Sequence, residues 1–188
     1  MEPIVATRSA SVEDRQLAVY DGLLPAQDIA RYAELLNRAP FTRTEVARPD
    51  TAEHKHWVSE MALPALMRLP LWQATAGAVR ALRPDETYRP YRVYTNHAAY
   101  GDMLYTHTDA QPGARELTAL WFICERWDTE WGGETLFFDD GGDAREVVSP
   151  RPGRLVLFDG AIRHCGRPPN RICFVPRYTL AIKLELAR

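Results

Sequence analysis

The chain has 188 residues, of which 46% are hydrophobic and 26% are charged, and its formal net charge is -2. This composition excludes a disordered protein, and the length allows a core to form without disulfides or a structural metal. The small negative charge argues against nucleic acid or an anionic membrane as a partner. The three cysteines are too few and too scattered for a disulfide framework, so we expect one cytoplasmic domain over residues 1–188.

The first 90 residues are predicted to supply mainly helical support. The segment 17–38 has the pattern of a short strand, a turn and a helix with apolar side chains at helical spacing. A second helix is predicted over residues 70–82, ahead of a proline that ends it. Residues 43–56 are polar and contain a proline, so we expect a loop there.

From residue 91 onward, short runs rich in Val, Tyr, Phe, Leu and Thr alternate with Gly, Pro and Asp clusters. This alternation predicts strands separated by turns, as in a β-sandwich or barrel. Helices packed on one face of a rolled antiparallel sheet would satisfy the layer rules, so the fold class is mainly β with N-terminal helices. The candidate strands are 91–96, 102–109, 117–124, 134–138, 154–159 and 177–185.

Three residues in this β-rich half have the side chains of a metal site. His107 and Asp109 form an H-x-D pair, and if they lie on a strand their side chains point to the same face. His164 follows an apolar strand and can approach from a neighbouring one. Two imidazoles and one carboxylate on one face of an ion are typical of non-haem Fe(II) oxygenases.

The surroundings of this triad make the pattern more specific. Asn96, Gly101 and Leu104 precede His107, and four further motifs follow it in order. These motifs are WGGETLF from residue 131, PGRLVLF from residue 152, His164 itself and RYTLAIK from residue 177. In their order and spacing they resemble the 2-oxoglutarate and Fe(II)-dependent dioxygenases, in particular the prolyl-4-hydroxylase-like branch.

The resemblance implies a double-stranded β-helix, also called a jelly roll, in residues 91–188, with the N-terminal helices bracing its larger sheet. It implies that His107, Asp109 and His164 bind Fe(II). It further implies that Arg177 grips the distal carboxylate of the cosubstrate 2-oxoglutarate, for which a planar guanidinium has the right geometry. Thr179, on the same strand face, can add a hydroxyl donor.

The resemblance also places Asn96 at the cosubstrate, but here the sequence departs from the family pattern. Relatives often have a tyrosine two residues after this asparagine, where the chain has Ala98, and another near position 122, where it has Phe122. Tyr94 and Tyr105 are the candidate substitutes, with core packing as the alternative role for each. Lys183 shares the strand face of Arg177 and is expected at the pocket rim.

The polar stretch 43–56 is predicted to act as a lid, since such oxygenases must exclude water during turnover. His54 and His56 within it are expected to face solvent, with substrate contact as the alternative.

Because Asp109 is present, the resemblance implies hydroxylation or another oxidation rather than halogenation. We therefore expect an Fe(II)- and 2-oxoglutarate-dependent enzyme that uses O2, with ascorbate as an optional reductant, and that releases succinate and CO2. The expected substrate is a small molecule or an amino-acid unit, since neither a basic groove nor a repeat is visible in the sequence. The alternatives are a protein or peptide prolyl hydroxylase and, from another class, a non-catalytic jelly-roll binding module.

Overall fold

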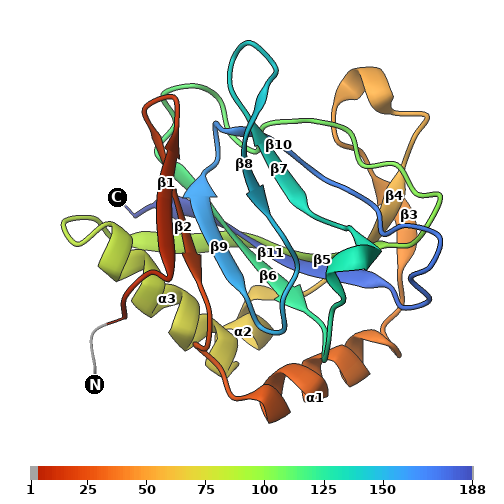
Figure 1. The fold of residues 1–188 in the computed structure, drawn as a ribbon. Helices are drawn as coiled ribbons and strands as arrows, with labels where there is room; N and C mark the ends of the chain where they lie inside the picture. The colour runs from red at the N-terminus through yellow and green to blue at the C-terminus, as the bar shows by residue number, and fades with distance from the viewer. Residues whose placement is uncertain (1–3, 188) are drawn as a thin grey trace.

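The computed structural model describes residues 4–187, which form two antiparallel sheets with helices outside them (Figure 1). The smaller sheet has the order β10 (Arg163–Gly166), β7 (Thr135–Phe138) and β8 (Ala144–Val148). The larger sheet has eight strands in the order β1 (Arg8–Val12), β2 (Arg15–Tyr20), β9 (Leu155–Asp159), β6 (Glu116–Ile123), β11 (Arg177–Leu186), β5 (Tyr88–Ala98), β4 (His56–Glu60) and β3 (Thr42–Glu45). The predicted jelly-roll class, mainly β with N-terminal helices, is confirmed.

The helices α1 (Ala26–Leu36), α2 (Leu63–Leu66) and α3 (Pro70–Leu82) cover one face of the larger sheet (Figure 1). Helix α3 begins at a proline, which lacks the N–H that the first helical residue leaves unpaired in any case. The predicted helix over residues 70–82 is therefore confirmed, as is the one within 17–38. Two short 3-10 helices, η1 (Pro49–Thr51) and η2 (Thr129–Trp131), lie in connections. Within residues 4–187, no helix is long and apolar enough to cross a membrane.

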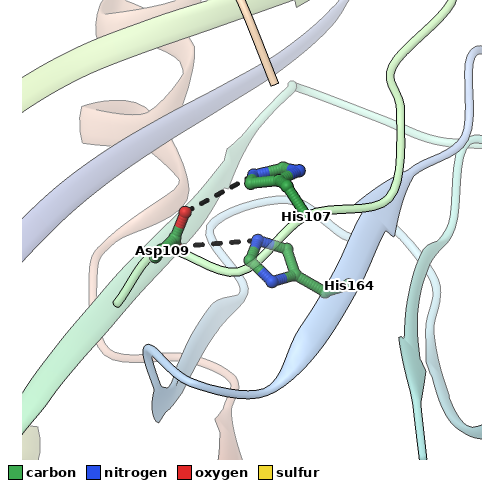
Figure 2. A group of neighbouring side chains, drawn as sticks. All are labelled: His107, Asp109 and His164. Atoms are coloured by element: carbon green, nitrogen blue, oxygen red, sulfur yellow. Dashed lines mark ion pairs between the residues drawn. The ribbon is translucent and has the colours of Figure 1, made fainter. Parts of the chain in front are cut away.

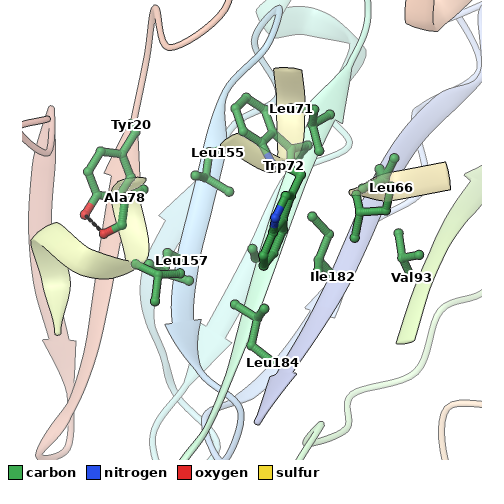
Figure 3. Close-up of a cluster of buried hydrophobic side chains, with 14 of the residues drawn as sticks. Tyr20, Leu66, Leu71, Trp72, Ala78, Val93, Leu155, Leu157, Ile182 and Leu184 are labelled. Atoms are coloured by element: carbon green, nitrogen blue, oxygen red, sulfur yellow. Dashed lines mark hydrogen bonds between the residues drawn. The ribbon is translucent and has the colours of Figure 1, made fainter. Parts of the chain in front are cut away.

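The main core lies between these helices and the larger sheet (Figure 3). Leu155 and Ile182 contribute from the strands, and Leu71 from α3, each fully buried. Trp121 is also fully buried, and its indole N–H donates to the Thr75 hydroxyl at 2.9 Å. The hydrogen bond satisfies the one polar group of this large side chain, so the helix layer is fixed to the sheet at that point.

A second cluster of buried residues fills the space between the two sheets. Phe137 from the smaller sheet and Phe158 from the larger one meet edge to face, with ring centroids 5.0 Å apart. The His164 ring packs against Phe158 with ring centroids 4.8 Å apart, so this imidazole is held by aromatic contacts on the inner side of the smaller sheet.

Two predicted elements are wrong. Residues 102–109 do not form a strand; they are a loop whose only ladder contact is a single bridge between His107 and His164. Residues 43–56 are not a simple loop, because β3, η1 and the first residue of β4 lie within them. The pairing of β4 with β5 explains this, since long-range partners can make a strand of a polar segment. The strands β1, β3, β4, β8 and β10 had no sequence prediction.

Candidate active site

The predicted triad converges in space (Figure 2). The backbone N–H groups of His107 and His164 each donate to the other's carbonyl at 2.9 Å, which places the two imidazoles side by side. Asp109 follows in the same loop, where its N–H donates to the Gly160 carbonyl at 2.8 Å. One ligand atom from each of the three side chains lies within 4.8 Å of the others. The loop that carries His107 and Asp109 is therefore fixed by backbone bonds to the chain around His164.

Both imidazoles are held with Nε2 toward the third member of the triad. The Nδ1 atom of His107 bonds to the Tyr105 carbonyl, and the Nδ1 atom of His164 bonds to the Ile162 carbonyl, each at 2.9 Å. Since a carbonyl can only accept, Nδ1 carries a proton in both rings, and Nε2 is the nitrogen left to bind a metal. The Nε2 atoms lie 3.4 Å (His107) and 3.6 Å (His164) from oxygens of Asp109. Two imidazoles and one carboxylate are thus a donor set that could hold a divalent metal.

The electrostatics of the site favour this set of charges. Burial lowers the pKa of His164 to about 4, so the ring is neutral near pH 7. Burial opposes ionisation of Asp109, but the neighbouring cation Lys183 and both imidazoles hold its pKa well below the usual range. Burial also opposes the charge on Lys183, yet Tyr94 and Asp109 raise its pKa. The ammonium and the carboxylate therefore form a buried ion pair.

A cavity of about 240 Å³ opens beside the triad, and Arg177 also lines it. This guanidinium is only 2% exposed, and burial lowers its pKa to about 10, so it stays charged. Its Nε donates to the Gly133 carbonyl at 2.6 Å and one Nη to the Thr135 hydroxyl at 2.8 Å, while the other Nη lies 3.4 Å from the Thr179 hydroxyl. The guanidinium carbon lies 5.2 Å from the centre of the Phe122 ring. These contacts fix the plane of the guanidinium, and within residues 4–187 no carboxylate forms an ion pair with it.

The surroundings of Arg177 fit a small anionic cosubstrate. A Cβ on Gly166 would lie 3.0 Å from an Nη atom of the Arg177 guanidinium, so only glycine leaves space beside this atom. Across the strand pair, Asn96 lies opposite Thr179, and both line the cavity. The side-chain oxygen of Asn96 is buried and has no hydrogen-bond partner among the residues that the structure describes. This oxygen can only accept, so it is the NH2 of the Asn96 amide, together with the free N–H groups of Arg177, that could donate to a dicarboxylate such as 2-oxoglutarate.

Two predicted residues line the cavity at other points. Tyr94 is buried beside Lys183, whose Nζ is 5.7 Å from the ring centre, and burial raises the pKa of this phenol. Tyr105 packs against His54 with the two rings tilted and their centroids 5.3 Å apart. The prediction that His56 faces solvent is wrong: it is buried in the cavity wall, and burial lowers its pKa.

Three residues of the cavity wall were not predicted from the sequence in the place where they lie. Lys183 was expected at the rim of the pocket but is 7% exposed and in contact with Asp109. The alternation of side chains along the strand predicted that Lys183 shares a sheet face with Arg177, but not how deeply it is buried. Thr118 had no signal, because a threonine in a β-rich run is ordinary. Glu45, which pairs with Arg92 at 2.7 Å, lies on a strand that was not predicted.

The fold and the site together define a class. A rolled pair of antiparallel sheets that presents two histidines and one aspartate to an enclosed cavity is the architecture of a non-haem Fe(II) oxygenase. Residues 93–182 match the family model of the 2OG-Fe(II) oxygenase superfamily. The matched residues include the whole triad and Arg177, and together with this donor set they indicate an oxidoreductase of that kind, with Fe(II) as cofactor and 2-oxoglutarate as cosubstrate.

Solved structures with the same fold include enzymes of several activities. A Pseudomonas putida prolyl-4-hydroxylase is 16% identical, with a TM-score of 0.63 and 92% of each chain covered. The non-haem α-ketoglutarate-dependent epimerase SnoN of nogalamycin biosynthesis is 17% identical, with a TM-score of 0.67, covering 89% of this chain and 76% of its own. EctD from S. alaskensis, solved with 2-oxoglutarate and 5-hydroxyectoine, is 17% identical, with a TM-score of 0.60, covering 98% and 81%. No curated protein matches the chain. At these identities the structural likenesses show the fold alone.

Proposed function

We propose that this protein is a hydroxylase that oxidises a C–H bond of a small molecule or an amino-acid unit, with conversion of 2-oxoglutarate and O2 to succinate and CO2. The observation that carries the proposal is one cavity of about 240 Å³ that both the triad and the Arg177 guanidinium line. A cavity of this size suits a cosubstrate and a compact substrate better than a folded partner.

In this proposal His107, Asp109 and His164 hold the iron, each through one atom that the local backbone already directs. Bound there with 2-oxoglutarate, Fe(II) supplies the activation of O2 that no side chain can provide. The aromatic packing around His164 keeps this side of the site free of water. The chain itself thus contributes three metal ligands held in fixed positions in a part of the cavity wall that excludes water.

Arg177 binds the distal carboxylate of the cosubstrate in this scheme, and Thr179 and Asn96 donate to it from neighbouring strands. The guanidinium is already held by Gly133 and Thr135, so little ordering is needed when the carboxylate arrives. Tyr94 and Tyr105 line the same cavity and are the further candidates for polar contacts to the cosubstrate or the substrate.

We also propose that residues 46–55 cover the cavity mouth. Arg48 donates to the Thr106 carbonyl, directly before His107, and its guanidinium carbon is 5.8 Å from the Tyr105 ring centre. The His54 ring packs at a tilt against the same tyrosine. This segment and the triad loop are therefore joined at one point, and hydrogen exchange with and without substrate would reveal whether they open together. Equal exchange of residues 46–55 in both states would argue against a lid.

The proposal is tested by substrate-stimulated succinate formation. Wild-type protein with Fe(II) and 2-oxoglutarate is assayed with a panel of amino acids and small metabolites and, separately, with proline-containing peptides. Stimulation by a small molecule supports the proposal, with Asp109→Ala as the inactive control. Stimulation by peptides alone favours the prolyl hydroxylase, the activity of the Pseudomonas putida enzyme with the same fold. Folded protein that binds neither metal nor 2-oxoglutarate would be a non-catalytic module.

A further inference from the structure

Lys183 and Thr118 lie directly opposite each other on the neighbouring strands β11 and β6. Both point into the cavity, where they meet the same atom of the triad. The Thr118 hydroxyl donates to Oδ2 of Asp109 at 2.6 Å, and the Lys183 ammonium contacts the same oxygen. The ammonium and the hydroxyl are also 3.3 Å apart. All three side chains are buried, so water does not compete for these contacts.

The two oxygens of Asp109 are therefore unequal. A carboxylate oxygen has two lone-pair directions, and on Oδ2 both point to donors from the large sheet. Oδ1 instead faces the Nε2 atom of His107 at 3.4 Å. The Nε2 atom of His164 lies nearer to Oδ2, at 3.6 Å. The hydroxyl and the ammonium thus occupy Oδ2, and Oδ1 is the oxygen that faces His107.

We propose that Lys183 and Thr118 are positioning residues that make Asp109 a one-oxygen ligand of the metal. The inference rests on the proposed metal site. A metal held by two imidazoles and one carboxylate oxygen keeps three of about six octahedral positions open, whereas a carboxylate that binds through both oxygens leaves only two. The cosubstrate and O2 together need three. Lys183 and Thr118 thus preserve the position that a chelating Asp109 would fill.

A simpler role for Lys183 would be that of counter-ion to a buried carboxylate. A counter-ion neutralises the pair but does not decide how many oxygens bind a metal, so the two roles predict different coordination. The measurement must therefore count the open positions on the metal rather than the rate of turnover.

Mn(II) is the probe, because it prefers the same ligands and six-fold geometry and relaxes the protons of its bound water. Water-proton relaxation is measured for wild type and for the double variant Thr118→Val/Lys183→Met, each saturated with Mn(II) without cosubstrate. We expect the relaxation per bound Mn(II) to fall by about a third in the double variant, from three waters to two. Thr118→Ser, which keeps the hydroxyl, should retain the wild-type value.

Thr95→Val is the matched control, because Thr95 is equally buried but its neighbours Tyr94 and Asn96, not Thr95, face the cavity. Equal relaxation in wild type and double variant overturns the inference while the metal site stands. Wild type that binds no Mn(II) overturns the proposed function and this inference together. If the double variant does not fold, Thr118→Val alone must show a decrease of the same sign, and no decrease there also overturns the inference.

Discussion

Replacing Arg177 with methionine removes the proposed anchor of the cosubstrate and keeps a side chain of similar length. The guanidinium is the one charged group on its side of the cavity that no carboxylate neutralises among the described residues, and its fork is held by Gly133 and Thr135. A buried charge-assisted pair of this kind contributes about 3 kcal/mol, so 2-oxoglutarate affinity should fall about 100-fold.

The assay is an anaerobic calorimetric titration of 2-oxoglutarate into protein loaded with Mn(II). Arg163→Met is the matched control, because Arg163 is exposed on the strand that carries His164. It should bind as wild type does, and Arg177→Lys should lie between the two, since it keeps the charge but loses the fork. The Arg177→Met substitution also leaves the Gly133 carbonyl without its donor, so circular dichroism must show that this variant is folded. An affinity within about threefold of wild type in folded Arg177→Met, against the 100-fold loss expected, would refute the assignment and leave Lys183 as the remaining buried cation.

Three further outcomes follow from single contacts. Gly166→Ala should weaken 2-oxoglutarate binding at least tenfold with metal affinity unchanged, because the new Cβ would lie 3.0 Å from the Arg177 guanidinium; equal cosubstrate affinity would show that this side of the fork is not used. Burial lowers the pKa of His164 to about 4, so the native state binds fewer protons than the unfolded chain between pH 6.5 and 4. As the pH falls from 6.5 to 4, the free energy of unfolding of metal-free protein should thus decrease by up to about 3 kcal/mol in urea titrations. The decrease should be smaller in His164→Gln, and an identical decrease in both proteins would contradict the lowered pKa of His164. Thr75→Val should cost about 1–3 kcal/mol in the same titration at pH 7, because it leaves the buried Trp121 indole N–H unpaired; no loss of stability would show that water replaces the hydroxyl.

The sequence predicted well those features that depend on local pattern. Helix α3 runs from Pro70 to Leu82 as expected, because its start and stop signals are local. The triad was found because its members are chemically distinctive and stand in a recognisable order of motifs. The strand predicted over residues 102–109 was wrong. A run such as Leu-Tyr-Thr has strand propensity, but in the fold this segment forms only one bridge, between His107 and His164.

The remaining site residues could not be predicted because they depend on tertiary pairing. Lys183 reaches Asp109 only because β11 lies between β5 and β6 and the sheet rolls toward the triad loop. His56 is buried only because β4 joins the edge of β5. Strand register of this kind is set by partners far away in the sequence, which periodicity alone does not reveal.

The most direct test of the account is O2-dependent succinate formation in wild type and in His107→Ala. Both proteins are loaded anaerobically with Fe(II) and 2-oxoglutarate, checked for native circular dichroism and then exposed to O2. The account predicts succinate in wild type and only the no-enzyme background in His107→Ala, because the triad then lacks one of its two imidazoles. Equal succinate formation by the folded variant would contradict the claim that this triad is the catalytic metal site.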